Sequence, residues 1–411
     1  MAPIRQRKID KKNLRVSNAG YSTGTMRQLG TYLCEEEKPL NFVVSGGVGL
    51  DDKYSPLAYF LEMQIGRYPI IVLHNNDYKM EGMVENIYMG RQVDTPLWFI
   101  HSDNPEYEPF FGMNEMQVIM VLRKVAEKMG YTIAPQFERI ARAHLEIMKY
   151  AGMEISLTGL YYLAQFNDMG EFHDNIMELP CGSTTARRIW ADIGSESIEN
   201  SGQLDLFRSV VNNLAYEARE SGWKSDNGIL QINCRQAVQQ NATLLLAVNA
   251  MYTEKLLTYL AEELKTVSGR PYILLIDDVI LEDETFREYI RNDSGCYLGL
   301  ISNDVVNMLK CPRDDFLAFA EKIDSFIFLK HGTGETAARL SEIMGNYDHA
   351  KLEMSSGRSK GAGSLFTRDV HNDVHVSVEN RSRVMPEVIA DLKEDQAIIF
   401  DARSNQIIYY N

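Results

Sequence analysis

The sequence predicts an α/β protein in which a mostly parallel β-sheet is flanked by helices and interrupted by an all-helical insertion. Short β-branched or leucine-rich runs alternate with stretches that carry apolar residues at helical spacing, which is typical of a parallel sheet. Between residues 110 and 222 strand signals are nearly absent. The chain has 411 residues, 45% of them apolar, enough to bury a large core. We therefore expect a basic N-terminal segment (1–40), a sheet domain (41–109 and 223–411) and an all-α insertion domain (110–222).

The first half of the sheet domain has the order strand, turn, helix, strand. The run NFVVS is apolar and ends in glycines, SPLAYFLEMQIG has helical spacing, and YPIIVLHNND is a second apolar strand. This order is a βαβ unit, which builds a parallel sheet. The run PLWFIHSDNP predicts a third strand.

Three stretches predict the helical insertion, because their apolar residues recur every three or four positions: MNEMQVIMVLRKVAEKMG, QFERIARAHLEIMKYAG and LDLFRSVVNNLAYEARE. After them, GILQINC predicts a strand, and the stretch from ATLLLAV to EELKTV predicts one long helix. Beyond the break at SGRP, the runs YILLIDD, CYLGLIS and SFIFLKH predict further strands of the same sheet. The C-terminal DQAIIFDARSNQIIYYN predicts a closing β-hairpin with its turn at 403–405.

Charge and cysteine content limit the class of protein. The net charge of −15 argues against a surface that grips phosphate backbones throughout, so contact with nucleic acid is expected to be local or shared with partners. The five cysteines are dispersed without CxxC spacing, which favours buried thiols in a reducing compartment. No apolar run reaches the ~20 residues of a membrane span, and the N-terminus lacks a signal peptide's apolar core. A cytoplasmic chain is expected.

A degenerate phosphate-binding loop follows the first strand. Such a loop needs glycines whose N–H groups wrap phosphates, a lysine for the β- and γ-phosphate oxygens, and a Ser or Thr hydroxyl for magnesium. The candidate cofactor-binding residues are Gly46, Gly47, Gly49, Lys53 and Tyr54. Asp52 stands where the last glycine belongs, and Tyr54 stands in the hydroxyl position. A carboxylate there repels phosphates by on the order of a few kcal/mol. A plain turn with a solvated lysine is the alternative interpretation.

An acidic pair, Asp277 and Asp278, ends the strand YILLIDD. In P-loop ATPases such a strand supplies an aspartate to the magnesium shell and a glutamate that activates water. Asp277 fits the metal-ligand role. Asp278 fits the second role with a side chain one methylene shorter. Acidic residues at strand ends are also ordinary caps, and that alternative stays open. We expect Lys53 and Asp277 to emerge from adjacent parallel strands and to meet at one edge of the sheet, in a site too acidic and too crowded for magnesium-ATP.

The order of these features resembles the TraG/TraD-type coupling proteins of conjugative type IV secretion. Their Asp-Glu strand is followed by a strand and Gln-x-x-x-Gln-Leu; here LISNDVVNML carries Asn303 and Asn307 at the glutamine positions. Further matches are FIFLK followed by GETAARLSEIMG, and RSRVMPEVIADL followed by QAIIF. The resemblance is close over 270–411 and looser over 40–100. In the insertion it is one of architecture only.

This resemblance implies a RecA-like P-loop ATPase fold, with ATP and magnesium as cofactors and Asp277, Asp278 and Asn303 at catalytic positions. Coupling proteins are membrane-anchored hexamers that pass relaxase-bound DNA or protein effectors to a secretion channel. The implied partners are secretion-channel or relaxosome proteins, single-stranded DNA and further copies of the chain. The implied location is the cytoplasm, at the cytoplasmic face of the membrane through those partners.

Three functions stay open at this stage. Because Asp52 and Tyr54 both weaken binding of magnesium-ATP, we favour a coupling-protein-like component that recruits substrate, with weak or lost ATPase activity and no required cofactor. The first alternative is an active, divergent DNA-translocating ATPase. The second is a non-enzymatic nucleic-acid-binding or assembly module, indicated by the basic N-terminus and the basic, glycine-rich stretch 357–363. His371 and His375 lie in a strand-like pattern and are expected to be exposed polar residues, not metal ligands.

Overall fold

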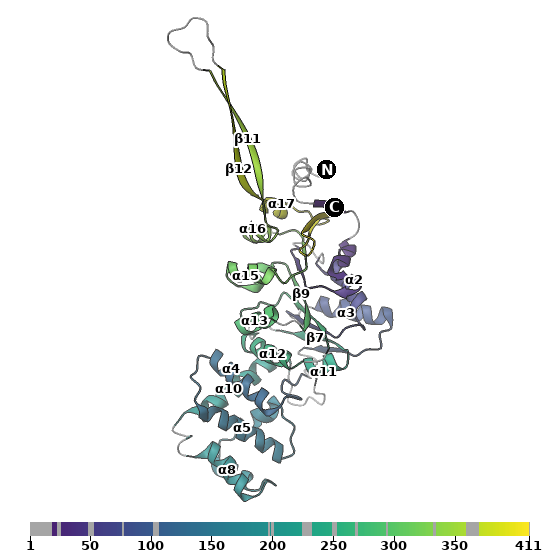
Figure 1. Cartoon of the computed structure of the whole chain (residues 1–411). Helices are drawn as coiled ribbons and strands as arrows, with labels where there is room; N and C mark the ends of the chain where they lie inside the picture. The colour runs from purple at the N-terminus through teal and green to yellow at the C-terminus, as the bar shows by residue number, and fades with distance from the viewer. Residues whose placement is uncertain are drawn as a thin grey trace.

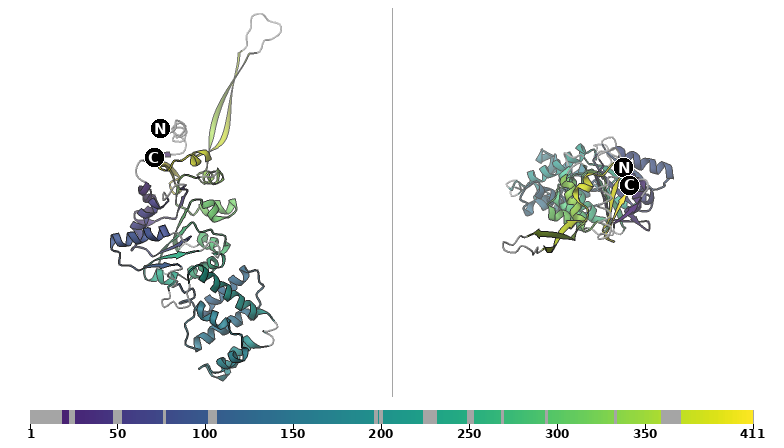
Figure 2. Two further views of the ribbon diagram at one scale, coloured as in Figure 1. Left: turned by 180° about the vertical axis from the view of Figure 1, so that it is seen from behind. Right: turned by 90° about the horizontal axis from the view of Figure 1, so that it is seen from above.

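The computed structural model describes residues 19–22, 26–47, 53–75, 78–101, 107–195, 198, 201–223, 232–248, 253–267, 270–292, 295–331, 334–358 and 370–410. These residues form a layered body around a large sheet, with the helices of residues 115–220 (the helical block) at one end and a two-stranded arm at the other (Figure 1). The view from behind in Figure 2 shows the same separation of block and arm.

The central sheet has ten strands among the described residues, in the order β1-β14-β13-β10-β4-β9-β8-β5-β7-β6. Every neighbouring pair from β10 to β6 is parallel, whereas β13 pairs antiparallel with both β10 and β14. The strands are β1 (Ala19–Ser22), β4 (Phe42–Ser45), β5 (Ile70–His74), β6 (Leu97–Ile100), β7 (Thr243–Ala247), β8 (Tyr272–Asp277), β9 (Cys296–Ser302), β10 (Ser325–Phe328), β13 (Ala397–Asp401) and β14 (Gln406–Tyr410). This confirms the mostly parallel sheet and the closing hairpin.

Helices cover both faces of this sheet, because alternate strand residues point to opposite sides. In β5, Ile71 and Leu73 enter one core and Ile70 and Val72 enter the other. One face is covered by η1 (Met26–Leu33), α2 (Tyr54–Gln64) and α3 (Tyr78–Arg91). The core on the other face includes residues of α11 (Cys234–Gln239), α12 (Thr253–Thr266), α13 (Glu284–Asn292), α14 (Val305–Leu309), α15 (Arg313–Ala320), α16 (Gly334–Ile343) and α17 (Pro386–Ala390).

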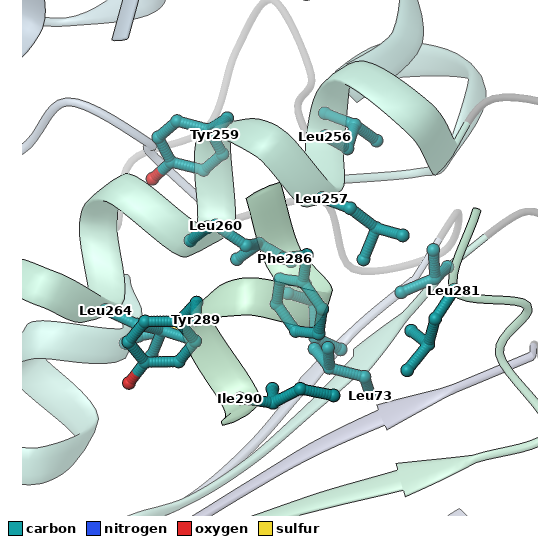
Figure 3. Packing of buried hydrophobic residues seen from close by; sticks show 14 of the residues in the cluster. Leu73, Leu256, Leu257, Tyr259, Leu260, Leu264, Leu281, Phe286, Tyr289 and Ile290 are labelled. Carbon is teal, nitrogen blue, oxygen red and sulfur yellow. The ribbon is translucent and has the colours of Figure 1, made fainter. Parts of the chain in front are cut away.

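Figure 3 shows this second core from close by, with apolar side chains of α12 and α13 gathered over Leu73 of β5. Leu257, Leu260 and Phe286 are each fully buried there. Burial of a large apolar side chain stabilises the fold by roughly 1.5–3 kcal/mol. This packing therefore fixes α12 on the sheet, and with it the buried carboxylate of Glu263 on the same helix.

Between residues 115 and 220 the described elements are all helices. A capping box formed by Asn114 and Gln117 starts α4, and Pro135 occupies the first turn of α5, where its missing N–H is harmless. The helices are α4 (Glu115–Lys128), α5 (Pro135–Tyr150), α6 (Leu157–Ala164), α7 (Met169–Met177), α8 (Ser183–Gly194) and α10 (Gln203–Glu220). We refer to these helices as the helical block.

Two small sheets complete the described elements. Strands β2 (Cys34–Glu35) and β3 (Lys38–Pro39) form a short ribbon after η1. Strands β11 (Asn346–Arg358) and β12 (Val370–Ser382) pair antiparallel along their full length and form the arm seen in Figures 1 and 2. The arm confirms the strand expected around His371 and His375.

The long helix expected from ATLLLAV to EELKTV was wrong. Thr243–Ala247 form β7, between β5 and β6, and α12 begins only at Thr253. All residues of β7 are buried, so its leucine run has no polar alternation to distinguish it from a buried helix.

The strand expected at GILQINC is also corrected in its described part. Ile232 makes a single bridge to Tyr107, and Cys234 already begins α11; residues 228–231 lie outside the described residues. Of the basic stretches, residues 1–18 and 359–363 are likewise outside them. Among the described helices none combines the length and the apolarity needed to cross a bilayer.

Candidate functional site

Polar residues gather at the carboxyl edge of the sheet, where β10, β4, β9 and β8 end side by side. Ser45 ends β4, Ser302 ends β9 in register with it, and Asp277 ends β8. Parallel strands bring their carboxyl ends to one edge, and ligands of open α/β sheets bind there. Lys53 reaches the same edge from the start of α2.

Lys53 pairs with both acidic residues. Its Nζ lies 3.0 Å from Asp277 Oδ1 and also forms an ion pair with Asp278 Oδ2. Lys53 is only 6% exposed and Asp277 only 1%. The convergence expected for Lys53 and Asp277 is thus present. Their strands are not adjacent as expected, since β9 separates β4 from β8; strand order is not encoded in a local sequence pattern.

Tyr54 satisfies the second oxygen of Asp277. Its hydroxyl donates a hydrogen bond to Asp277 Oδ2 over 2.9 Å, and its ring lies under the Lys53 ammonium, 4.9 Å from Nζ to the ring centroid. Burial raises the pKa of Asp277 to about 6, although the charge of Lys53 and the hydrogen bonds from Lys53 and Tyr54 oppose the rise. Burial lowers the pKa of Lys53, but Asp277 and Asp278 outweigh it and the net direction is up. The lysine therefore stays charged.

Asp278 is held by the end of β9. Its Oδ1 accepts hydrogen bonds from Ser302 Oγ at 2.7 Å and from the backbone N–H of Asn303 at 3.1 Å. Its φ of 49° lies in the left-handed region, which is uncommon for a residue other than glycine. Asn303 therefore reaches the acidic pair through its backbone, and its side chain is exposed.

The two described glycines of the loop are explained by packing. Gly46 N–H donates to Ser302 O and Gly47 N–H donates to Lys330 O, each over 2.9 Å. Their φ values are 105° and 109°, and a Cβ on Gly46 would lie 2.8 Å from the backbone of Leu329. Both amides are thus committed to neighbouring chain segments. Gly49 and Asp52 lie outside the described residues.

A buried serine–histidine pair beside the loop was missed in the sequence. Ser45 Oγ lies 2.9 Å from His331 Nε2, and His331 Nδ1 lies 2.8 Å from the Leu329 carbonyl oxygen. A carbonyl only accepts, so Nδ1 carries the proton and Nε2 accepts from the serine hydroxyl. Burial lowers the pKa of His331, which favours the neutral ring. The available signal was that each residue is the last one of an apolar run, Ser45 of NFVVS and His331 of SFIFLKH.

The described side chains do not fit magnesium-ATP as they are arranged. A magnesium ion needs free carboxylate oxygens and a short hydroxyl. Here the Lys53 ammonium lies between the aspartates, and the Tyr54 phenol bonds directly to Asp277. Within the described ranges no group of three His, Cys, Asp or Glu side chains is placed to hold a metal. Ion pairs and hydrogen bonds within the cluster thus occupy the aspartate oxygens at this edge.

Comparisons with known proteins identify the fold. No family model matches the sequence, and no curated protein matches it. Among solved structures, the chain is similar to the unbound monoclinic form of the bacterial conjugative coupling protein TrwBdeltaN70, with a TM-score of 0.55, 12% identity, and coverage of 94% of this chain and 91% of that one. The trigonal form of that protein in complex with sulphate gives a TM-score of 0.55 and 12% identity over 95% and 93%. The chain has the coupling-protein fold, a RecA-like α/β fold, as the resemblance implied.

Proposed function

We propose that this chain is a coupling-protein-like component of a conjugative or type IV secretion system, which recruits DNA–protein or protein substrates without magnesium-dependent ATP turnover. The fold shared with a conjugative coupling protein supports the first part. The position of the Lys53 ammonium between Asp277 and Asp278 is the observation that carries the second part. Secretion-channel or relaxosome proteins, single-stranded DNA and further copies of the chain are the proposed partners.

The energetics of the cluster support a silent site. To bind magnesium, Asp277 has to release Lys53 and the Tyr54 hydroxyl, and a hydrogen bond to a charged group contributes about 1.5–3 kcal/mol. The released lysine then has to find phosphate oxygens at a loop whose Gly46 and Gly47 amides are already bonded to the chain. Binding of nucleotide therefore starts with a loss of several kcal/mol, on the order of two such bonds.

Turnover and binding assays test this proposal. We expect no magnesium-dependent ATP hydrolysis by the native chain. The double variant Asp52→Gly, Tyr54→Thr removes the extra carboxylate and supplies a short hydroxyl, so we expect it to gain nucleotide affinity in isothermal titration calorimetry. Lys149→Ala, on the exposed face of α5, is the matched lysine control. Robust native turnover that Lys53→Ala abolishes and Lys149→Ala spares would overturn the proposal.

An active, divergent ATPase is the second candidate, because Lys53 and the two aspartates do converge at one edge. The same assay separates the two candidates. If native turnover were found, the cluster would be a resting state that nucleotide opens. A nucleic-acid-binding module would instead show strong, salt-dependent binding to single strands with no role for Lys53.

A further inference from the structure

The helical block joins the sheet domain through two chain segments that touch each other. The outgoing segment is 107–113, and the returning segment comprises Trp223 and 232–235. The N–H of Tyr107 donates to the carbonyl of Trp223 over 2.9 Å, and the two rings lie 5.0 Å apart between centroids. We call these two contacting segments the hinge of the helical block.

A single carboxylate, that of Glu263 on α12, binds both segments. Its Oε2 accepts a hydrogen bond from the Tyr107 hydroxyl and another, over 2.6 Å, from the Tyr259 hydroxyl. Its Oε1 accepts from the Cys234 N–H over 2.8 Å. Glu263 is 1% exposed, and Tyr107, Tyr259 and Cys234 are fully buried. These donors are all neutral, and so is the backbone N–H of Arg235, which also favours the ionised carboxylate.

No cation among the described residues is paired with Glu263. Arg235, next to Cys234, donates to the Gly112 carbonyl, and the Glu108 carboxylate accepts from the Leu157 N–H over 2.7 Å. Three ion pairs lie on or beside α12. Lys124 of α4 pairs with Glu262 of α12 at 2.8 Å, and Lys255 of α12 pairs with Glu217 of α10 at 2.5 Å. Lys128 of α4 pairs with Asp283, just before α13, at 3.3 Å. Each of these charges already has its own partner.

The environment of Glu263 therefore penalises the ionised form. Burial raises the pKa of its carboxyl to about 7, and the hydrogen bonds from Tyr107, Tyr259 and Cys234 reduce the rise without cancelling it. Burial also raises the pKa of both tyrosines and of Cys234 well above their ordinary values, so these groups keep their protons. Glu263 is the group of this cluster that changes charge near neutral pH.

The cluster has an alternative hydrogen-bond pattern ready for the protonated acid. The Tyr259 hydroxyl lies 2.6 Å from Glu263 Oε2 and 2.7 Å from the Pro109 carbonyl oxygen, but its single proton serves one acceptor at a time. When Glu263 is ionised, the tyrosine donates to the carboxylate. When a proton from solvent adds to Oε2, the acid donates to the tyrosine oxygen, and the tyrosine donates to Pro109. Tyr107 has its own second partner, Cys234 Sγ at 3.3 Å.

We propose that Glu263 is a proton-dependent latch at the hinge of the helical block. In the protonated state the latch is closed: Tyr259 ties α12 to the outgoing segment at Pro109, and no charge is buried. In the ionised state a charge without a cation lies inside the hinge, and opening of the hinge to water relieves it. The block is therefore held more loosely above neutral pH than below it. This inference is independent of the state of the Lys53 cluster.

Fluorescence of Trp223 tests the latch, because its ring lies against Tyr107 inside the hinge. The chain has three tryptophans, and Trp98→Phe with Trp190→Phe leaves Trp223 alone. Removal of Trp190 also removes its ring contact with His173. In this full-length background we expect one emission transition with a midpoint near pH 7.

Glu263→Gln keeps the shape of the side chain and is expected to abolish the transition. Glu262→Gln, the neighbouring acid with its own lysine partners, is the matched control and is expected to keep it. Tyr259→Phe removes hydrogen bonds from both forms, but the bond to the ionised carboxylate is charge-assisted and therefore the stronger one, so we expect the midpoint to move to higher pH. A transition that persists in Glu263→Gln, a flat titration of the parent background, or an unmoved midpoint in Tyr259→Phe would each overturn the proposal.

Discussion

Two carboxylates of this chain, Asp277 and Glu263, are buried to the same extent but have different neighbours. Asp277 and Glu263 are each 1% exposed, and burial raises both pKa values, to about 6 and about 7. Asp277 faces the Lys53 ammonium, whereas Glu263 faces only neutral donors. The sheet edge thus keeps a charge by pairing it, and the hinge avoids a charge by binding a proton. The first arrangement suits a fixed structural cluster, and the second suits a switch.

The largest effect is expected from Lys53→Ala. Removal of one partner from a buried ion pair leaves an uncompensated charge and destabilises a protein by about 3–5 kcal/mol. The loss should be largest at pH 8 and smaller near pH 5, because the raised pKa of Asp277 lets it take up a proton there. Urea unfolding of the variant and the native chain at both pH values measures this.

Lys265→Ala is the control for that experiment. Lys265 pairs with Glu262 over 2.7 Å, but its side chain is 42% exposed, so solvent screens the pair. We expect a loss below about 1 kcal/mol. If Lys53→Ala were as mild as this control, the sheet-edge cluster would contribute little to the fold, and the contrast with Glu263 would disappear.

The second effect is a pH dependence that belongs to Glu263. Its ordinary pKa is 4.5 and its folded pKa about 7, so the native chain holds the proton more tightly than the unfolded chain. Stability from this group is complete below the unfolded pKa and falls as the pH rises through the folded one. The loss amounts to ~3 kcal/mol, at 1.36 kcal/mol for each unit of pKa difference.

Glu263→Gln isolates this contribution. Between pH 4.5 and pH 8 the native chain should lose ~3 kcal/mol of unfolding free energy relative to the variant, which has no carboxyl group at this position. Glu262→Gln should show no such shift in the variant's favour, because its lysine partners more than offset burial and hold its pKa below the ordinary value. Parallel pH profiles for the native chain and Glu263→Gln would contradict the assignment.

Local sequence patterns were sufficient for most strands and for one half of this comparison. An apolar run that ends in glycines or aspartates is recognisable as a strand with a polar carboxyl end. Because parallel strands end at the same edge of a sheet, the sequence alone assigns Lys53 and Asp277 to one sheet edge. That edge was predicted with the wrong neighbours, because β9 enters between β4 and β8 only through long-range pairing. The leucine run of β7 was misassigned for the related reason that a strand buried on both faces lacks alternation.

The Glu263 cluster had no such signal. Its donors come from positions 107, 234 and 259, on three segments that only the folded hinge brings together. No spacing rule connects a tyrosine, a backbone N–H of a cysteine and a glutamate at those separations. Burial without a cation decides the chemistry of Glu263, and burial of a single residue is a tertiary property.

The smallest expected effect is the difference in lost stability between Tyr54→Phe and Tyr259→Phe, each of which removes one tyrosine hydroxyl. Tyr54 donates to a carboxylate that stays ionised beside Lys53, and loss of a hydrogen bond to a charged group costs about 1.5–3 kcal/mol. Tyr259 donates to a carboxylate that is also ionised at pH 8, but its pKa of about 7 lies only one unit lower, so protonation costs about 1.4 kcal/mol and limits the loss in Tyr259→Phe to about 1 kcal/mol. Urea unfolding at pH 8 measures both variants, with Tyr162→Phe, 72% exposed, as the control for loss of a phenol. The expected difference arises because Asp277 stays ionised in Tyr54→Phe, whereas Glu263 can take up a proton in Tyr259→Phe. Equal losses of stability in the two variants would contradict this explanation.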